Sequence, residues 1–234
     1  MVGPMPDARA TVWWDFDGTL AYRDGMWSAA LISALGRVHP THGVAVEQIK
    51  PGLRDGFPWH RPETLHSELA DADTWWAALH PLFVAAYRAA DVAADVAGHA
   101  AALVREVYAD VSGWRLLEGA GEALELTFAR GIRNVVVSNH VPELPALITG
   151  LGLSDLVADV VNSASVGAEK PNPVIFAAAR AVSIVDRPIW MVGDSELADI
   201  GGAAAVGVPG ILVGKTSGRT ALDAARAIVA DVAA

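Results

Sequence analysis

The sequence predicts an α/β fold: a Rossmann-like, doubly wound parallel sheet as the core, with a helical cap domain inserted near its start. Two observations support this prediction. Apolar stretches of strand length alternate with helical patterns in the second half of the chain, which is typical of βαβ units. The segment 22–114 has helical periodicity and no convincing strand. We therefore expect residues 1–21 and 115–234 to form the core and residues 22–114 to form the cap.

Each element follows from a local pattern. The expected strands are runs rich in apolar residues, at 11–16, 132–138, 156–161, 188–192 and 209–213. The core helices are expected between and around them, at 116–130, 141–151, 172–182, 196–206 and 219–232. The cap has helical periodicity at 27–38, 74–92 and 93–108. Its stretch 50–62 holds three prolines and two glycines and is expected to be rich in loops.

Composition limits the function classes. With 234 residues, 53% of them hydrophobic, the chain can bury one sizeable core, or a core with a smaller domain. A formal net charge of -10 argues against nucleic acid or an anionic membrane as a partner. The absence of cysteine excludes disulfides and thiolate metal sites. No secretory signal stands out in residues 1–10, and no apolar stretch is uncharged over a membrane span, so we expect a cytoplasmic monomer or homodimer.

Two carboxylates lie two residues apart at the end of the first expected strand. In extended backbone Asp15 and Asp17 point the same way, and Gly18 allows the chain to turn after them. Like charges this close raise the pKa of one group or require a cation. The pair therefore indicates a metal site, an acid/base couple, or both. A calcium loop is disfavoured because residues 19–24 offer few oxygen ligands.

Polar residues also follow the later strands. Ligands of an open parallel sheet bind beyond the carboxyl ends of its strands, so these residues are expected to meet. Ser138 and Asn139 could form a phosphate cradle or cap the next helix. Lys170 could neutralise a phosphate or lie on the surface. Asp194 and Asp199 could add carboxylates to a metal site, or be a helix cap and a solvated helix residue.

Taken in order, the aspartate pair, the hydroxyl, the lysine and the acidic cluster resemble the motifs of the haloacid dehalogenase-like hydrolase superfamily. The resemblance extends from Asp15 to Asp199. It implies that Asp15 attacks phosphorus to form an aspartyl-phosphate, and that Asp17 acts as general acid and base. It also implies that Ser138 binds the phosphoryl oxygens and that Lys170 steadies both nucleophile and phosphate.

The resemblance further implies a Mg²⁺ cofactor. Its ligands would be the carboxylates of Asp15 and Asp194 and the backbone carbonyl of Asp17. Asp199 would support the metal's waters or Lys170. The phosphate-binding region would be shaped by a further group of residues: Gly18, Thr19 and Asn139. Gly193 stands where some members place a second acidic ligand.

Within the superfamily, Asp17 favours an oxygen leaving group. Dehalogenating members release a halide, which needs no proton, and they lack the second aspartate. We therefore predict a phosphatase that acts on a small phosphorylated metabolite. Phosphonate cleavage, which uses a cap lysine, is disfavoured because the insertion holds only Lys50. Phosphohexomutase-like activity, 2-haloacid dehalogenation and non-catalytic binding of a phosphorylated ligand stay open as alternatives.

The conspicuous side chains of the cap are Trp27, Trp59, His60, Arg61, Trp75 and Trp76. Trp59, His60 and Arg61 lie in the proline-rich stretch and could contact the part of the substrate that carries no phosphate. Arg61 is a candidate substrate-binding residue. The alternative is that the tryptophans form the cap's own core and that Arg61 is solvated. In the core, His140 could reach the substrate, but we expect a solvated ring at the start of a helix.

Overall fold

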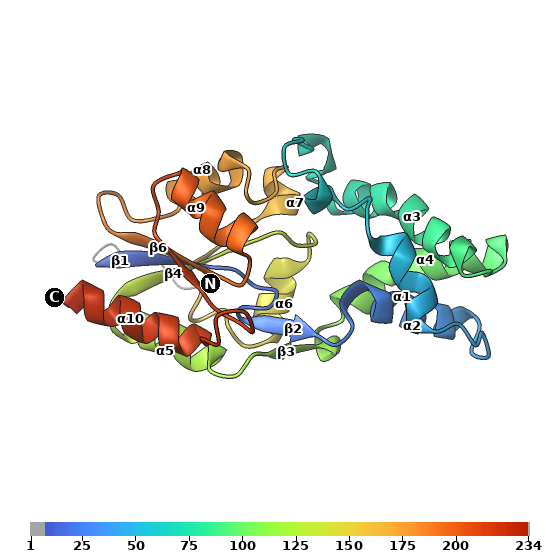
Figure 1. Ribbon diagram of the computed structural model, residues 1–234, viewed down its shortest axis with the longest axis horizontal. Helices are drawn as coiled ribbons and strands as arrows, with labels where there is room; N and C mark the ends of the chain where they lie inside the picture. Colours follow the sequence, from blue (N-terminus) through green and yellow to red (C-terminus); the bar gives the residue numbers. More distant parts are fainter. Residues whose placement is uncertain (1–7, 234) are drawn as a thin grey trace.

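The computed structural model describes residues 8–233. Residues 1–7, which belong to the stretch without a recognisable secretory signal, and residue 234 lie outside this description. The core is a five-stranded parallel sheet in the order β5-β4-β1-β6-β7 (Figure 1). The strands are β1 (Ala10–Trp14), β4 (Ile132–Ser138), β5 (Asp159–Asn162), β6 (Ile189–Gly193) and β7 (Gly210–Leu212). The order reverses direction at β1, which is where an open sheet binds ligands.

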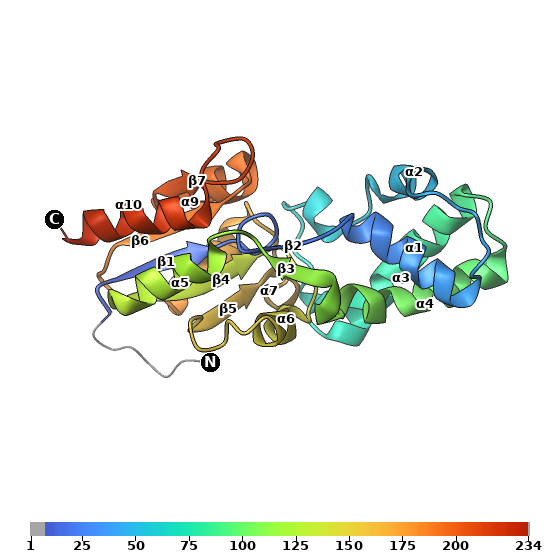
Figure 2. The ribbon, with the colours of Figure 1, turned by 90° about the horizontal axis from the view of Figure 1, so that it is seen from below.

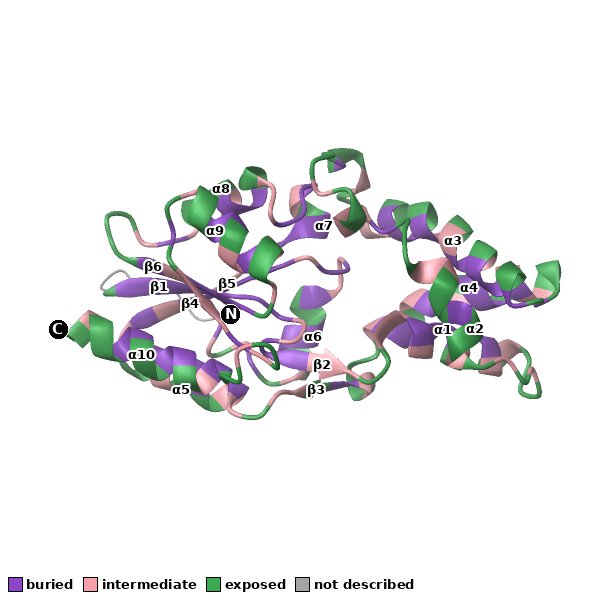
Figure 3. Ribbon diagram, in the orientation of Figure 1, coloured by how far each residue is buried: buried purple, intermediate pink, exposed green. Residues whose placement is uncertain are grey.

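Helices cover both faces of this sheet, so the predicted doubly wound fold is confirmed. Successive side chains of a strand point to opposite faces. Trp14 accordingly packs with α5 and α10, whereas Trp13 packs with α8 and α9. These helices are α5 (Ala120–Ala129), α8 (Pro173–Ala181), α9 (Gly202–Ala205) and α10 (Ala221–Ala233). Figure 3 shows β1 and β4 in the colour of buried residues between the two layers.

Short helical segments complete the core. α6 (Leu144–Gly150) follows β4, and α7 (Ser163–Val166) follows β5. A π-helical turn, η5 (Glu196–Gly201), lies between β6 and α9. Single-turn π-helical segments inside helices are frequent at functional sites. The expected helix 196–206 is therefore present, but its first part is wound more widely than an α-helix.

The residues between β2 (Ala21–Arg23) and β3 (Trp114–Leu116) form the helical cap, residues 24–113. β2 and β3 pair in antiparallel fashion. The sequence did not indicate these strands, because three residues are too few to give a period. The predicted boundaries, after residue 21 and before residue 115, fall inside them, and the division into two domains stays a prediction.

The cap is built mainly from three helices, α1 (Met26–Val38), α3 (Ala72–Ala89) and α4 (Ala94–Ala109), together with the single-turn helix α2 (Val46–Ile49). The stretch expected to be loop-rich contains short turns, η1 (Lys50–Leu53) and η2 (Pro58–His60), and η3 (Ser67–Leu69) and η4 (Val111–Gly113) follow. Within residues 8–233, no helix combines the length and the apolar character needed to cross a membrane.

The cap lies beyond the carboxyl ends of the strands (Figure 2). Its polar contacts with the core include two at glutamates of the core, besides a hydrogen bond from Asn172 Nδ2 to the carbonyl of Pro62 at 2.9 Å. At the first, the Glu143 carboxylate accepts hydrogen bonds from Trp76 Nε1 at 3.0 Å and from Arg105 Nε at 2.7 Å. At the second, Nε2 of His66 lies 3.1 Å from Oε1 of Glu169, and both side chains are buried. These contacts hold the cap over the edge of the sheet where the polar residues gather.

Candidate active site

Asp15 lies immediately after β1, at the edge of the sheet that faces the cap. Its backbone N–H donates to the carbonyl of Val192 at 2.9 Å, so the parallel pairing with β6 fixes its position. Its Oδ1 accepts hydrogen bonds from Ser138 Oγ at 2.8 Å and from Lys170 Nζ at 2.7 Å. Its Oδ2 accepts no hydrogen bond from the described residues. One oxygen of the carboxylate is therefore held, and the other is available to a ligand.

Lys170 is a buried cation with three acceptors. Its Nζ donates to Asp15 Oδ1, to the carbonyl of Val137 at 2.7 Å, and to Asp199 Oδ1 at 2.6 Å. Burial by itself would lower the pKa of Lys170, but the charges of Asp15 and Asp199 raise the pKa above its usual value. Asn139 fixes the backbone: its Oδ1 accepts from Lys170 N at 2.6 Å and its Nδ2 donates to Lys170 O at 3.0 Å.

Asp199 lies in the π-helical turn η5 and accepts a hydrogen bond from Lys170. Its Oδ2 accepts from the N–H of Ser195 at 3.0 Å, while Oδ1 accepts from the lysine. Burial raises the pKa of Asp199 to about 6, against the lowering effect of Lys170. A Cβ on Gly193 would lie 2.2 Å from Asp199 Cγ. The space beside Gly193, where some relatives were expected to place a second acidic ligand, is therefore filled by Asp199.

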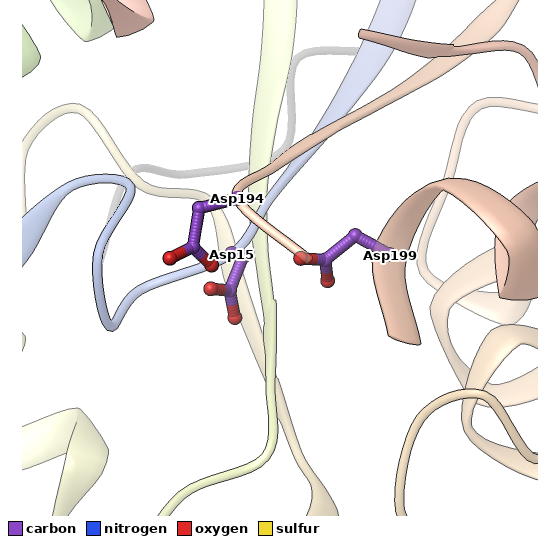
Figure 4. Close-up of side chains that lie close together, drawn as sticks. All are labelled: Asp15, Asp194 and Asp199. Carbon is purple, nitrogen blue, oxygen red and sulfur yellow. The ribbon is translucent and has the colours of Figure 1, made fainter. Parts of the chain in front are cut away.

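Three carboxylates form an acidic cluster. Asp15, Asp194 and Asp199 each offer an oxygen, and these oxygens lie within 4.8 Å of one another (Figure 4). Burial, followed by the charge of Asp15, raises the pKa of Asp194 to about 6. Because both oxygens of Asp199 already accept hydrogen bonds, Asp15 and Asp194 are the better donors to a cation. Oxygen donors of this kind fit a hard divalent ion such as Mg²⁺.

The turn after Asp17 closes tightly around this cluster. Gly18 has φ +79°, in the left-handed region that favours glycine, and a Cβ there would lie 2.3 Å from Asp194 Oδ2. A glycine is therefore needed for the backbone to approach the carboxylate. Thr19 is buried, and its hydroxyl has no hydrogen-bond partner among the described residues.

Asp17 is the one acidic residue of the site with an unpartnered buried oxygen. Its Oδ1 has no hydrogen-bond partner among the described residues, although 27% of its side-chain surface is exposed. Burial, and then the charges of Asp15 and Asp194, raise the pKa of Asp17 well above its usual value, and Lys170 opposes this only in part. A carboxyl group in this environment keeps its proton to higher pH than a solvated aspartate does.

The expectation that His140 has a solvated ring is wrong. The residue is 2% exposed, and its Nε2 lies 3.8 Å from Asp17 Oδ1. The ring packs against Phe16 and Trp114, with centroid distances of 5.3 and 5.2 Å. Burial lowers the pKa of His140 to about 4, so the ring is neutral. The physical reason is that α6 begins only at Leu144, so His140 lies in a segment that the cap covers.

The site opens into a cavity of about 520 Å³ between core and cap. This volume lies in the range of small-molecule sites, roughly 300–1,000 Å³. The core contributes the charged and polar residues: Asp15, Asp17, Asn139, His140, Lys170, Asp194, Ser195 and Asp199. The cap contributes Met26, Trp27, Trp59, Pro62 and Tyr108.

The structure brings most of the expected site residues together, with one exception. Arg61 does not line the cavity; its side chain is 64% exposed and pairs with Asp55 at 3.0 Å. Arg61 was expected to bind the substrate, but it is not among the described residues that line this cavity. Conversely, Tyr108 lines the cavity although no sequence pattern indicated it as a site residue. It lies at the end of α4, where burial, and then the charge of Asp17, raise its pKa.

Fold and site together define an α/β protein with an acidic, lysine-bearing site at the carboxyl edge of its sheet. A family model described as haloacid dehalogenase-like hydrolase matches residues 10–207. The mouse haloacid dehalogenase-like hydrolase domain-containing protein 3 is 33% identical over 195 residues, which cover 79% of this chain and 74% of the relative. The chain belongs to the haloacid dehalogenase-like hydrolases, as its motifs predicted.

Two further similarities concern part of the chain or the fold alone. A phosphoglycolate phosphatase of Rhodospirillum rubrum is 37% identical over 106 residues, covering 44% of this chain and 43% of that protein. The HAD-hydrolase YfnB from Bacillus subtilis, in a form bound to magnesium, superposes with a TM-score of 0.61 at 21% identity. That match covers 88% of this chain and 89% of the other, and at this identity it supports the fold.

Proposed function

We propose that this protein is a Mg²⁺-dependent phosphatase that hydrolyses the phosphate monoester of a small metabolite through an aspartyl-phosphate. The observation that carries the proposal is the pairing of Asp15 and Asp17. Asp15 is held through Oδ1 alone, by Ser138 and Lys170, which leaves Oδ2 free to attack phosphorus. Asp17 beside it has a raised pKa and can supply a proton. Covalent catalysis of this kind divides one difficult displacement into two easier ones.

The residues around Asp15 prepare it for an anionic substrate. Lys170 places a permanent positive charge against the nucleophile, and the hydrogen bond from Ser138 fixes the rotamer of the carboxylate. Asp199 and Asn139 hold the lysine in place through its Nζ and its backbone. When bound by Asp15, Asp194 and the Asp17 carbonyl, Mg²⁺ would neutralise charge and let the phosphate approach the carboxylate.

Asp17 moves the protons. As the bond between phosphorus and the ester oxygen breaks, protonated Asp17 gives its proton to the leaving alcohol. The resulting carboxylate then takes a proton from water, whose oxygen attacks phosphorus and releases phosphate from Asp15. Each turnover therefore returns both aspartates to their starting states. Positioned proton transfer of this type typically contributes ~10²–10⁴-fold to the rate.

Two observations support a phosphatase over release of a halide. A halide leaves without a proton, so a carboxyl group with a raised pKa beside the nucleophile has no task in that reaction. The relative from Rhodospirillum rubrum is named as a phosphatase, although the match covers less than half of either chain. The intact set of charged residues also favours catalysis over mere binding of a phosphorylated ligand.

The proposal is tested with Asp15→Asn. Hydrolysis of p-nitrophenyl phosphate in the presence of Mg²⁺ is expected to fall to background, while circular dichroism and the melting temperature show that the variant folds. Asp24→Asn, at an exposed aspartate outside the cavity, is the matched control and should keep wild-type activity. Wild-type activity in Asp15→Asn, or chloride release from 2-chloropropionate without any phosphatase activity, would refute the proposal.

A further inference from the structure

The wall of the cavity formed by the cap consists of apolar and aromatic side chains. Trp27 stacks on Tyr108 with a centroid distance of 3.9 Å and an interplanar angle of 13°. Trp59 stacks on Phe57 at 4.6 Å and 10°. Trp27 and Trp59 are only half-buried and both line the cavity, as do Met26 and Pro62. The part of a substrate that faces the cap therefore meets flat, uncharged surfaces.

The same cavity, among its described lining residues, offers no free cation to a second anionic group. Among the described residues that line it, Lys170 is the only lysine or arginine, and its three N–H groups are used by Asp15, Val137 and Asp199. The ring of His140, which also lines the cavity, is 2% exposed and packs against Phe16 and Trp114. A carboxylate or a second phosphate on the substrate would lose water without gaining a partner, which is costly.

Arg61 and Arg23 do not line the cavity, although Nε and Nη1 of Arg23 are buried and have no hydrogen-bond partner among the described residues. Arg61 points to an exposed ion pair with Asp55 outside the cavity. Arg23 lies with its Cζ 5.8 Å from the centroid of the Tyr108 ring and is likewise not among the residues that line the cavity. Arg23 is the last residue of β2, the strand that leads from the core into the cap.

We propose that the substrate is a phosphate monoester whose alcohol carries a flat, uncharged, apolar or aromatic group, and that Trp27 and Trp59 select it. This inference rests on the proposed phosphatase activity and adds its substrate class. It sets the chain apart from a phosphatase for phosphoglycolate, whose leaving group carries a carboxylate. Offset stacking on an aromatic side chain is worth about 0.5–1.5 kcal/mol beyond burial of area, which corresponds to roughly 2–13-fold.

The test compares esters that differ in one property of the alcohol. Benzyl phosphate is flat and uncharged, cyclohexylmethyl phosphate is apolar but not flat, and 4-carboxybenzyl phosphate adds one negative charge. We expect kcat/KM to be about 2–13-fold higher for benzyl than for cyclohexylmethyl phosphate. For 4-carboxybenzyl phosphate and for phosphoglycolate we expect values at least about 10-fold lower than for benzyl phosphate. Equal or better turnover of either carboxylate-bearing ester would overturn the inference.

A variant pair assigns the selection to the cap. Trp59→Leu keeps an apolar side chain but removes the flat ring, so the benzyl to cyclohexylmethyl ratio should fall towards 1. Trp190→Leu, at a half-buried tryptophan of β6 outside the cavity, should keep the wild-type ratio. An unchanged ratio in Trp59→Leu would overturn the role of Trp59.

Acetyl phosphate distinguishes failure of the proposed phosphatase activity from failure of the proposed substrate preference. It is small and reactive and makes little demand on the cap, so its hydrolysis reports the phosphatase itself. If acetyl phosphate is hydrolysed and the ester series shows no preference for the flat uncharged group, the inference on substrate class fails alone. If no ester and no acetyl phosphate is hydrolysed, the proposed function fails and the inference with it. The wild-type series decides the question even if the tryptophan variants do not fold.

Discussion

The two halves of the cavity are built on different physical grounds. In the core half, Asp15, Lys170 and Asp199 are buried, and Lys170 donates hydrogen bonds to both carboxylates. In the cap half, the wall is a stack of rings, in which Trp27 lies on Tyr108 and Trp59 lies on Phe57. The core half fixes charges at the ends of strands, whereas the cap half presents surface and shape.

This difference separates reaction from selection. Chemistry with an anionic substrate needs charges at fixed positions, and strand ends of a buried parallel sheet provide them. Selection of the leaving group needs a surface that can differ between relatives without disturbing those charges. A cap joined to the core by a few polar contacts, among them those at Glu143 and at Glu169, meets that need. Changes in the core half should therefore affect every substrate, and changes in the cap half should affect the ratio between substrates.

Among changes that keep the nucleophile Asp15, the largest effect should come from Asp17→Asn. Because the amide can neither give a proton to the leaving alcohol nor take one from water, kcat for alkyl esters should fall by ~10²–10⁴-fold. With p-nitrophenyl phosphate, whose leaving group needs no proton, the first step should survive and the second should become limiting. Stopped-flow absorbance should then record a burst of about one p-nitrophenolate per enzyme, followed by slow turnover.

The wild type and the pH profile complete this test. Since burial and neighbouring carboxylates raise the pKa of Asp17, the acid form persists to higher pH, and kcat/KM of the wild type should fall as pH rises through that pKa. In Asp17→Asn, kcat/KM should not show this fall with rising pH. Equal losses for alkyl and aryl esters, with no burst, would mean that Asp17 acts on binding in both halves of the cavity and does not move protons.

The core half of the site could be predicted from the sequence, for a physical reason. Parallel strands end at one edge, so residues such as Asp15, Ser138 and Asp194 must meet there if the strands are identified, even though they are far apart in the chain. The strands could be identified because short runs such as residues 132–138 have a β-branched, apolar centre, here Val135, Val136 and Val137, all of which are buried. The helices between them are long enough for their apolar residues to show helical periodicity in the sequence.

The cap half could not be predicted in the same way. The helical period of 93–108 places Tyr108 on the helix but does not say which partner the helix end will meet. The burial of His140 depends on rings contributed by Phe16 and Trp114, which approach only in the folded chain. Arg61 was expected near the substrate from its neighbours in the sequence, whereas its ion pair with Asp55 keeps it outside the cavity. Such packing depends on contacts that no local pattern encodes.

A smaller effect, restricted to the core half, is expected for Gly18→Ala. The added Cβ would lie 2.3 Å from Asp194 Oδ2 in a left-handed backbone, so the carboxylate or the turn must move. Displacing a group that positions a metal site typically lowers metal affinity about 10–100-fold. The Mg²⁺ concentration for half-maximal activity should rise by that factor, and calorimetric titration with Mg²⁺ should give the same shift.

Gly131→Ala is the matched control for this glycine. It also has a positive φ, +69°, but a Cβ there meets nothing within 4 Å. Both variants therefore carry the backbone cost of a left-handed alanine, about 1–2 kcal/mol, and only Gly18→Ala crowds the carboxylate. An equal loss of Mg²⁺ affinity in the two variants would mean that general destabilisation causes the loss. The close approach of Gly18 to Asp194 would then not matter for metal binding.

The smallest effect concerns the contact that holds the two halves together. His66 and Glu169 are buried, with Nε2 3.1 Å from Oε1, and the hydrogen bond to Glu169 raises the pKa of His66. The contact should therefore stabilise the fold fully below about pH 6.5, the usual histidine pKa, and lose this effect as pH rises through the folded value. In urea titrations between pH 6 and 9, the free energy of unfolding of the wild type minus that of His66→Gln should fall as the pH rises. The difference from His39→Gln, at an exposed histidine, should stay constant over this range. A pH-independent difference for His66→Gln would mean that the cap is held to the core without the charge of this histidine.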